Sequence, residues 1–132
     1  MMDRETIESP PGGPKHMKGM VAGVRAGNLI FFSAIRGRDP ADGSFSDDTK
    51  VQAAHAFEAL KMLLEHQGLT LGHVVKVTLY MNSLEYRDLI HEVWMQYWPT
   101  DPPARTAFQV VNASASPKAN AHFVLDVVAL AG

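Results

Sequence analysis

The 132-residue chain contains no cysteine, which excludes disulfide bonds, Cys-based zinc sites and thiol nucleophiles. It has no block of basic residues and a formal net charge of −2, so a nucleic-acid partner is not expected. No apolar run approaches the roughly 20 residues that cross a bilayer, so no membrane association is expected. The polar first 18 residues lack the apolar core of a secretory signal, which favours a cytoplasmic protein.

Motifs for metals and cofactors are also missing. The six histidines form no pair with a metal-ligand spacing such as i, i+4 on one helix. There is no glycine-rich phosphate loop and no Gly-x-Ser-x-Gly nucleophile elbow. We therefore expect neither a metal nor a cofactor.

The length and composition of the chain are typical of one soluble globular domain. Hydrophobic residues make up 46% and charged residues 20% of the chain. Residues 1–17 are rich in proline and glycine and are expected to form a flexible N-terminal arm. Residues 18–132 are expected to form the single folded domain.

Hydrophobic periodicity predicts the elements of this domain. Strands are expected at 20–25, 29–35, 74–81, 105–111 and 121–130, and helices at 47–67 and 84–98. Ser46 or Asp47 is expected to cap the first helix, Asn82 or Ser83 the second. The apolar stripes are Ala54, Phe57, Leu60 and Leu64 on the first helix, and Tyr86, Leu89, Ile90, Val93 and Tyr97 on the second.

The predicted order is β-β-α-β-α-β-β, an α+β fold with two helices on one face of a single sheet. Apolar residues occupy both faces of several strands, and two helices cannot cover them all. This surplus predicts burial of the second sheet face against another subunit.

Arg105 is the strongest candidate for a binding residue. It begins a predicted strand directly after the rigid segment Pro102-Pro103-Ala104. An arginine that follows a conformationally restricted segment is well placed to bind a planar carboxylate through two parallel hydrogen bonds. A solvated arginine at a strand start is the alternative.

Three further sets of residues are candidates, and the first two have two interpretations each. His91 is either a surface histidine or a cleft donor and proton shuttle. Asp126, in an apolar strand, is either an ion-pair partner for a neighbouring subunit or a catalytic group. Arg36 and Arg38 are interpreted as solvated loop charges.

The order of elements and three segments resemble the RidA/YjgF family of reactive-intermediate (enamine/imine) deaminases. The segments are Gly27-Asn28-Leu29-Ile30-Phe31-Phe32-Ser33, Gly68-Leu69-Thr70-Leu71-Gly72-His73-Val74-Val75-Lys76-Val77-Thr78 and Pro103-Ala104-Arg105-Thr106-Ala107. The resemblance implies a chorismate-mutase-like fold, a homotrimer, and ligand sites in the clefts between subunits. It also implies that the arginine at position 105 grips the carboxylate of a 2-aminoacrylate-like imine, which water then hydrolyses.

Several site positions depart from the family pattern. The family serine is present as Ser33, but Met20 stands at a tyrosine position and Ala107 at a frequent cysteine position. His91 stands where the family has asparagine, and Val124 where it has an acidic residue that is thought to position the attacking water. Asp126 lies two residues further along the same strand face. The resemblance therefore implies a catalytic set of Arg105, Asp126 and His91, and a substrate-binding set of Arg105, Ser33, Met20 and Ala107.

Three functions stay open at this point. The first is hydrolytic deamination of a small enamine or imine carboxylic acid, which needs only orientation and a sited water. The second is a non-catalytic trimer that binds small carboxylates, which the valine at position 124 favours. The third is RNA cleavage, against which the net charge of −2 argues.

Overall fold

The computed structural model describes residues 2–114 and 116–132. Its elements are β1 (Arg4–Ile7), β2 (Gly23–Ala26), β3 (Leu29–Phe32), α1 (Thr49–His66), the 3₁₀ turn η1 (Leu71–His73), β4 (Val74–Met81), α2 (Tyr86–Tyr97), β5 (Ala104–Gln109) and β6 (Phe123–Leu130).

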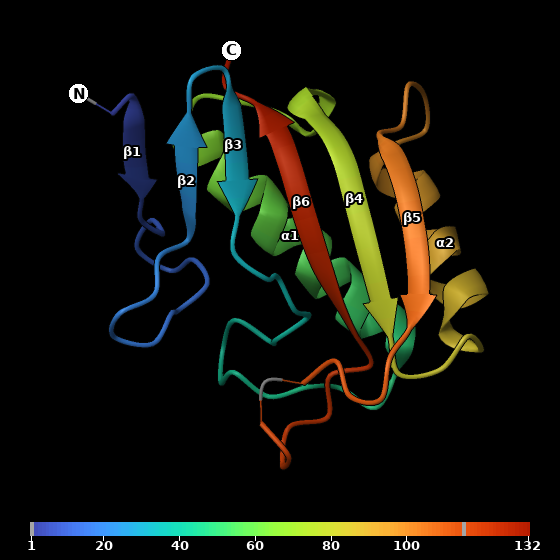
Figure 1. The fold of residues 1–132 in the computed structure, drawn as a ribbon. Coiled ribbons are helices and arrows are strands. Elements are labelled where there is room, and N and C mark those ends of the chain that lie inside the picture. Colours follow the sequence, from blue (N-terminus) through green and yellow to red (C-terminus); the bar gives the residue numbers. More distant parts are fainter. Residues whose placement is uncertain (1, 115) are drawn as a thin grey trace.

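The strands form one sheet in the order β1-β2-β3-β6-β4-β5. Neighbours pair antiparallel except β4 and β5, which are parallel and joined through α2. Both helices lie on the same face of the sheet (Figure 1). The predicted α+β class and the single layer of two helices are therefore confirmed.

The hydrophobic core lies between the sheet and the helices. Val77 and Leu79 of β4 and Leu125 of β6 are at most 1% exposed, as strand alternation requires. Phe57 of α1 is fully buried, and its ring forms a T-shaped pair with that of Trp94 of α2 at a centroid distance of 6.1 Å. This contact joins the two helices over the sheet.

The N-terminal segment contains a strand that the sequence pattern did not predict. β1 pairs antiparallel with β2 along the edge of the sheet, and Ile7 is only 3% exposed. The observed order is therefore β-β-β-α-β-α-β-β. Alternation over four residues, followed by a run of proline and glycine, is too short a signal to separate a strand from an arm.

The helix boundaries differ slightly from the predicted ones. Asp48, rather than Ser46 or Asp47, caps α1 by accepting a hydrogen bond from the Lys50 amide. The Asn82 side chain does not cap α2, because it bonds the Ala113 amide and the Ala121 carbonyl instead. Glu85 occupies the N-cap position of α2, and its side chain makes no capping hydrogen bond.

Apolar side chains also lie on the sheet face without helices. Phe31, Phe108 and Leu130 are 47%, 52% and 41% exposed. The rings of Phe108 and Tyr80 stack on neighbouring strands at 6.0 Å. Neither helix of the described chain is long and apolar enough to cross a membrane.

Candidate functional site

Arg105 is the second residue of β5, an edge strand. The chain reaches it through a sharp bend at Asp101, whose φ of 49° is in the left-handed region that aspartate tolerates, followed by Pro102 and Pro103. Arg105 pairs in register with Val77, which is fully buried. Because paired residues share a sheet face, the Arg105 side chain extends on the helix side, towards α2.

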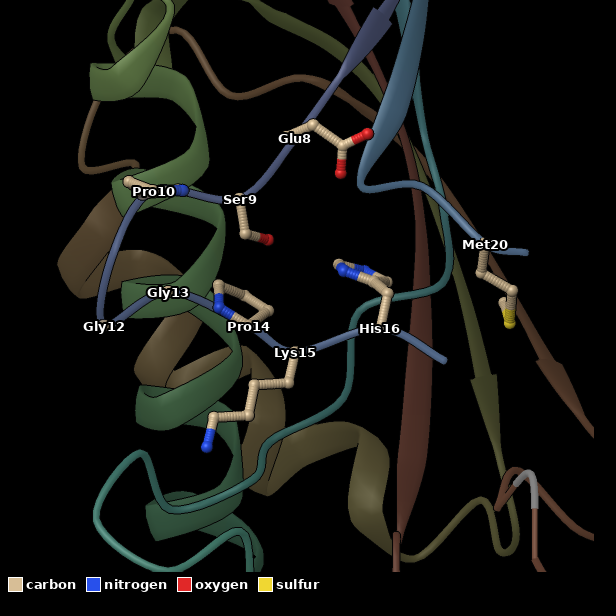
Figure 2. Close-up of a pocket in the computed structure, with 9 residues that line it drawn as sticks. All are labelled: Glu8, Ser9, Pro10, Gly12, Gly13, Pro14, Lys15, His16 and Met20. Carbon is tan, nitrogen blue, oxygen red and sulfur yellow. The ribbon is translucent and has the colours of Figure 1, made fainter. Parts of the chain in front are cut away.

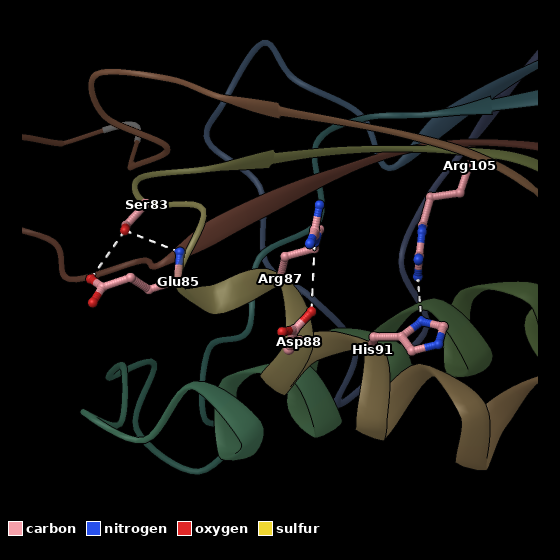
Figure 3. Close-up of polar contacts among 6 residues, drawn as sticks. All are labelled: Ser83, Glu85, Arg87, Asp88, His91 and Arg105. Atoms are coloured by element: carbon pink, nitrogen blue, oxygen red, sulfur yellow. Dashed lines mark hydrogen bonds and ion pairs between the residues drawn. The ribbon is translucent and has the colours of Figure 1, made fainter.

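Two side chains of α2 hold the Arg105 guanidinium in place. Nη1 lies 3.1 Å from Nδ1 of His91 (Figure 3). The guanidinium carbon also lies 4.7 Å from the ring centroid of Trp94. Since a guanidinium only donates hydrogen bonds, Nδ1 must accept, and a neutral His91 then carries its proton on Nε2. The contact with the indole adds a cation–π attraction.

The charge on Arg105 is incompletely compensated. No carboxylate of the described residues lies within ion-pair distance of its guanidinium. Burial, and then the nearby positive charge of Arg87, lowers the pKa of Arg105. Both effects disfavour the cation, so an anion at this position would be stabilised.

Sequence reasoning missed Trp94 and Arg87. The predicted stripe of α2 included Leu89, which is 37% exposed, and omitted Trp94, which is 4% exposed. Positions 87, 91 and 94 follow the i, i+4, i+7 spacing of one helix face. The helical spacing of positions 87 and 94 from His91 could therefore have predicted that both residues lie on its side of the helix.

The expected substrate-binding residues occupy two separate regions of one chain. Ser33 follows β3, and its Oγ donates to the Val21 carbonyl at 2.6 Å. Met20 lies before β2 and is 52% exposed. Strands β6 and β4 separate β3 from β5, which at about 4.8 Å per strand places Ser33 roughly 14 Å from the Arg105 strand. Only Ala107, two residues along β5, shares the strand and face of Arg105.

Asp126 lies on the opposite face of the sheet from Arg105. It is exposed and pairs with Thr78, the neighbour of Val77 along β4, so it points away from the helices. Val124 pairs with Tyr80 and shares this face. A single chain therefore brings together Arg105 and His91, but neither Asp126 nor Ser33.

The described residues contain no cluster of three or more His, Asp or Glu side chains that could hold a metal. Arg105, His91 and Trp94 form instead a cationic and aromatic surface suited to a planar organic anion.

Comparisons with known proteins identify a family and individual relatives that this chain resembles in sequence. A family model described as endoribonuclease L-PSP matches residues 13–129. A RutC family protein of Pyrococcus abyssi is 34% identical over 98 residues, which are 74% of this chain and 77% of that protein. The chloroplastic Reactive Intermediate Deaminase A of Arabidopsis thaliana is 30% identical over 88 residues, 66% of this chain and 47% of that protein.

Solved structures share the fold over nearly the whole chain. Escherichia coli TdcF, solved with bound serine, superposes with a TM-score of 0.84 at 25% identity, covering 96% of this chain and 98% of that one. RidA from an Antarctic Psychrobacter gives the same TM-score and identity, with 96% and 99% covered.

Proposed function

The chain belongs to the RidA/YjgF family, and from that membership we propose that it hydrolyses a small enamine or imine carboxylic acid at a cleft between the subunits of a homotrimer. The observation that carries the proposal is the half-buried Arg105 guanidinium, which two α2 side chains orient and no carboxylate of the described residues neutralises. The serine bound to TdcF is itself a small amino acid with a carboxylate.

The proposed cleft needs a neighbouring subunit. Arg105 lies on the edge strand β5, whereas Ser33 and Met20 lie beyond β4 and β6. A second copy that places its Ser33 side against the Arg105 edge would complete the site without moving either strand. The exposed apolar residues Phe31, Phe108 and Leu130 supply the surface for this association.

The proposed reaction needs few catalytic groups from the protein. Arg105 holds the substrate carboxylate, a water adds to the imine carbon, and the resulting carbinolamine collapses to a ketone and ammonia. Since the imine is already electrophilic, orientation supplies most of the acceleration. Asp126 of one subunit is the remaining candidate to orient the water, because Val124 cannot hold it.

A direct test generates the imine in situ from an L-amino acid with an amino acid oxidase and follows ammonia release. Wild type should shorten the lifetime of the imine, and Arg105→Ala should leave it at the uncatalysed value. Loss of a charge-assisted bidentate contact corresponds to a roughly ten- to a hundredfold decrease in affinity. Arg105→Lys should retain only part of the acceleration of imine hydrolysis, because an ammonium group cannot donate two parallel hydrogen bonds to a carboxylate as the planar guanidinium does.

A second function is favoured by the position of Asp126. Within one chain, Asp126 lies on the sheet face opposite to Arg105, and Val124 offers no polar group. A trimer that binds small carboxylates without turnover accounts for this arrangement. Calorimetric binding of 2-oxobutyrate together with an unchanged imine lifetime would select this function.

A further inference from the structure

A second cavity lies on the β1–β3 side of the molecule, and Met20 of the expected substrate-binding set is among its lining residues. It encloses about 960 Å³ between the segment 12–20, the loop 34–43 and the outward side of α1. Neither Arg105 nor His91 lines it. Its volume lies within the range of small-molecule sites.

The loop wall of this cavity is fixed against α1. Gly37 packs directly on the helix backbone, and a Cβ at this position would lie 2.0 Å from the carbonyl oxygen of Gln52. Only glycine permits so close an approach. The loop therefore presents the flanking residues Arg36 and Arg38 at defined positions.

These two arginines carry uncompensated positive charge. Arg36 Nε donates to the Ala113 carbonyl at 2.7 Å, and Arg38 Nη1 donates to the Gly43 carbonyl at 3.0 Å. Neither guanidinium forms an ion pair with any described residue. Burial, and then the charge of Arg38, lowers the pKa of Arg36. Both side chains keep N–H groups that are free for an anion.

The loop carboxylates in the same wall are engaged in turns. Asp39 Oδ1 accepts from the Ala41 amide at 2.8 Å. Asp42 Oδ1 accepts from both the amide and the hydroxyl of Ser44, at 2.9 and 2.6 Å. These bonds hold the two loop carboxylates in turns, and Glu58 of α1, which also lines the cavity, forms no ion pair with either arginine.

The wall of the larger cavity that α1 forms contains a buried polar atom without a hydrogen-bond partner among the described residues. Nδ1 of His55 is buried and has no hydrogen-bond partner among the described residues. A smaller cavity of about 420 Å³ is also lined by residues 12–16, and Ser9 and His16 point into it (Figure 2). The Ser9 hydroxyl is likewise buried and unpartnered. Buried polar groups in native proteins are normally hydrogen-bonded, so such atoms indicate a missing partner.

We propose that the larger cavity is a second ligand site, which binds a small organic anion with an apolar body. The anionic group is held by Arg36 and Arg38, and His55 supplies a hydrogen bond. The apolar body packs on Ile35, Met17 and Met62, which line the same space. The flexible methionine side chains adapt to ligands of different shape.

The test is titration calorimetry with three probes on the wild-type protein. Hexanoate carries both the charge and the apolar body, hexanol only the body, and acetate only the charge. Hexanoate should bind once per chain at this cavity, and the other two should bind at least tenfold more weakly. Because hexanoate can also reach Arg105, the titration is repeated with Arg105→Ala, which should retain the binding.

Two variants and their controls locate the site. Arg36→Gln combined with Arg38→Gln should weaken hexanoate binding at least tenfold, whereas the charge-matched pair Arg4→Gln and Arg25→Gln should not. Met62→Glu should repel the anion, whereas Val51→Glu, on the same helix and equally 38% exposed, should not. Melting temperatures establish that each variant is folded.

Three outcomes would overturn the proposal. The first is no binding of hexanoate to Arg105→Ala up to about 10 mM, a concentration well above the dissociation constant of a specific site. The second is equal binding of hexanoate and hexanol. The third is unchanged affinity in folded Met62→Glu. None of these outcomes depends on imine hydrolysis, so the deaminase proposal stands or falls separately.

Discussion

The guanidinium of Arg105 and the imidazole of His91 form a hydrogen bond of 3.1 Å between β5 and α2. The bond exists only while Nδ1 of His91 has a free lone pair. We therefore propose that His91 positions the proposed carboxylate anchor, Arg105.

Removing the acceptor at position 91 should weaken ligand binding. We expect His91→Leu to bind 2-oxobutyrate about tenfold more weakly than wild type, in line with a lost hydrogen bond to a charged group. His91→Gln keeps an acceptor and should bind within about threefold of wild type. Titration calorimetry at pH 8 measures the affinity of both variants for 2-oxobutyrate. Equal affinities of His91→Leu and wild type would show that Trp94 alone orients the arginine.

Restoring a carboxylate at position 124 should raise the deamination rate. A positioned general base commonly contributes 10²–10⁴-fold, and Val124 cannot supply one. Val124→Glu should therefore release ammonia from the imine faster than wild type, and Val124→Gln should not. If a trimeric, ligand-binding Val124→Glu is no faster, the missing carboxylate does not limit this protein.

The open sheet face should be an oligomer interface. Analytical ultracentrifugation at micromolar concentration should give about three times the 14.5 kDa chain mass. Phe31→Glu places a charge on this face and should shift the mass towards one chain, because an unpaired charge is costly to bury. Val51→Glu on the helix side is the control. A wild-type particle of 14.5 kDa would exclude the trimer.

His122 should make the protein less stable in acid. Its Nδ1 lies 2.8 Å from the Thr49 hydroxyl, and its ring stacks on Tyr86 at 4.4 Å. Burial lowers the pKa of His122, although Asp47 and Asp48 oppose the shift. The unfolded chain, in which a histidine titrates near pH 6.5, therefore binds this proton more readily than the folded chain.

Stability should consequently fall as the pH drops below about 6.5 and stop falling below the folded pKa of His122. Urea unfolding at pH 7.5, 6.5, 5.5 and 5.0 measures this dependence. His122→Gln removes the titrating group, so the free energy of unfolding should vary less with pH than in wild type. Identical pH dependence in the two proteins would assign the acid sensitivity to other groups.

Local patterns were sufficient for most of the fold. The alternation of Val77 and Leu79 in β4, the helical spacing of Phe57, Leu60 and Leu64, and the stop at Gly68 all depend on neighbours along the chain. β1 was missed because four residues at a sheet edge carry little periodic signal.

The sequence by itself determined the α+β class, the family and the candidate role of Arg105, because each depends on short-range pattern or on a contiguous motif. Only the tertiary structure decided which groups surround that arginine. It placed His91 and Trp94 against the guanidinium, and Asp126 and Ser33 elsewhere. Strand order and strand register set these distances, and both arise from long-range packing that one residue's neighbours in the chain do not encode.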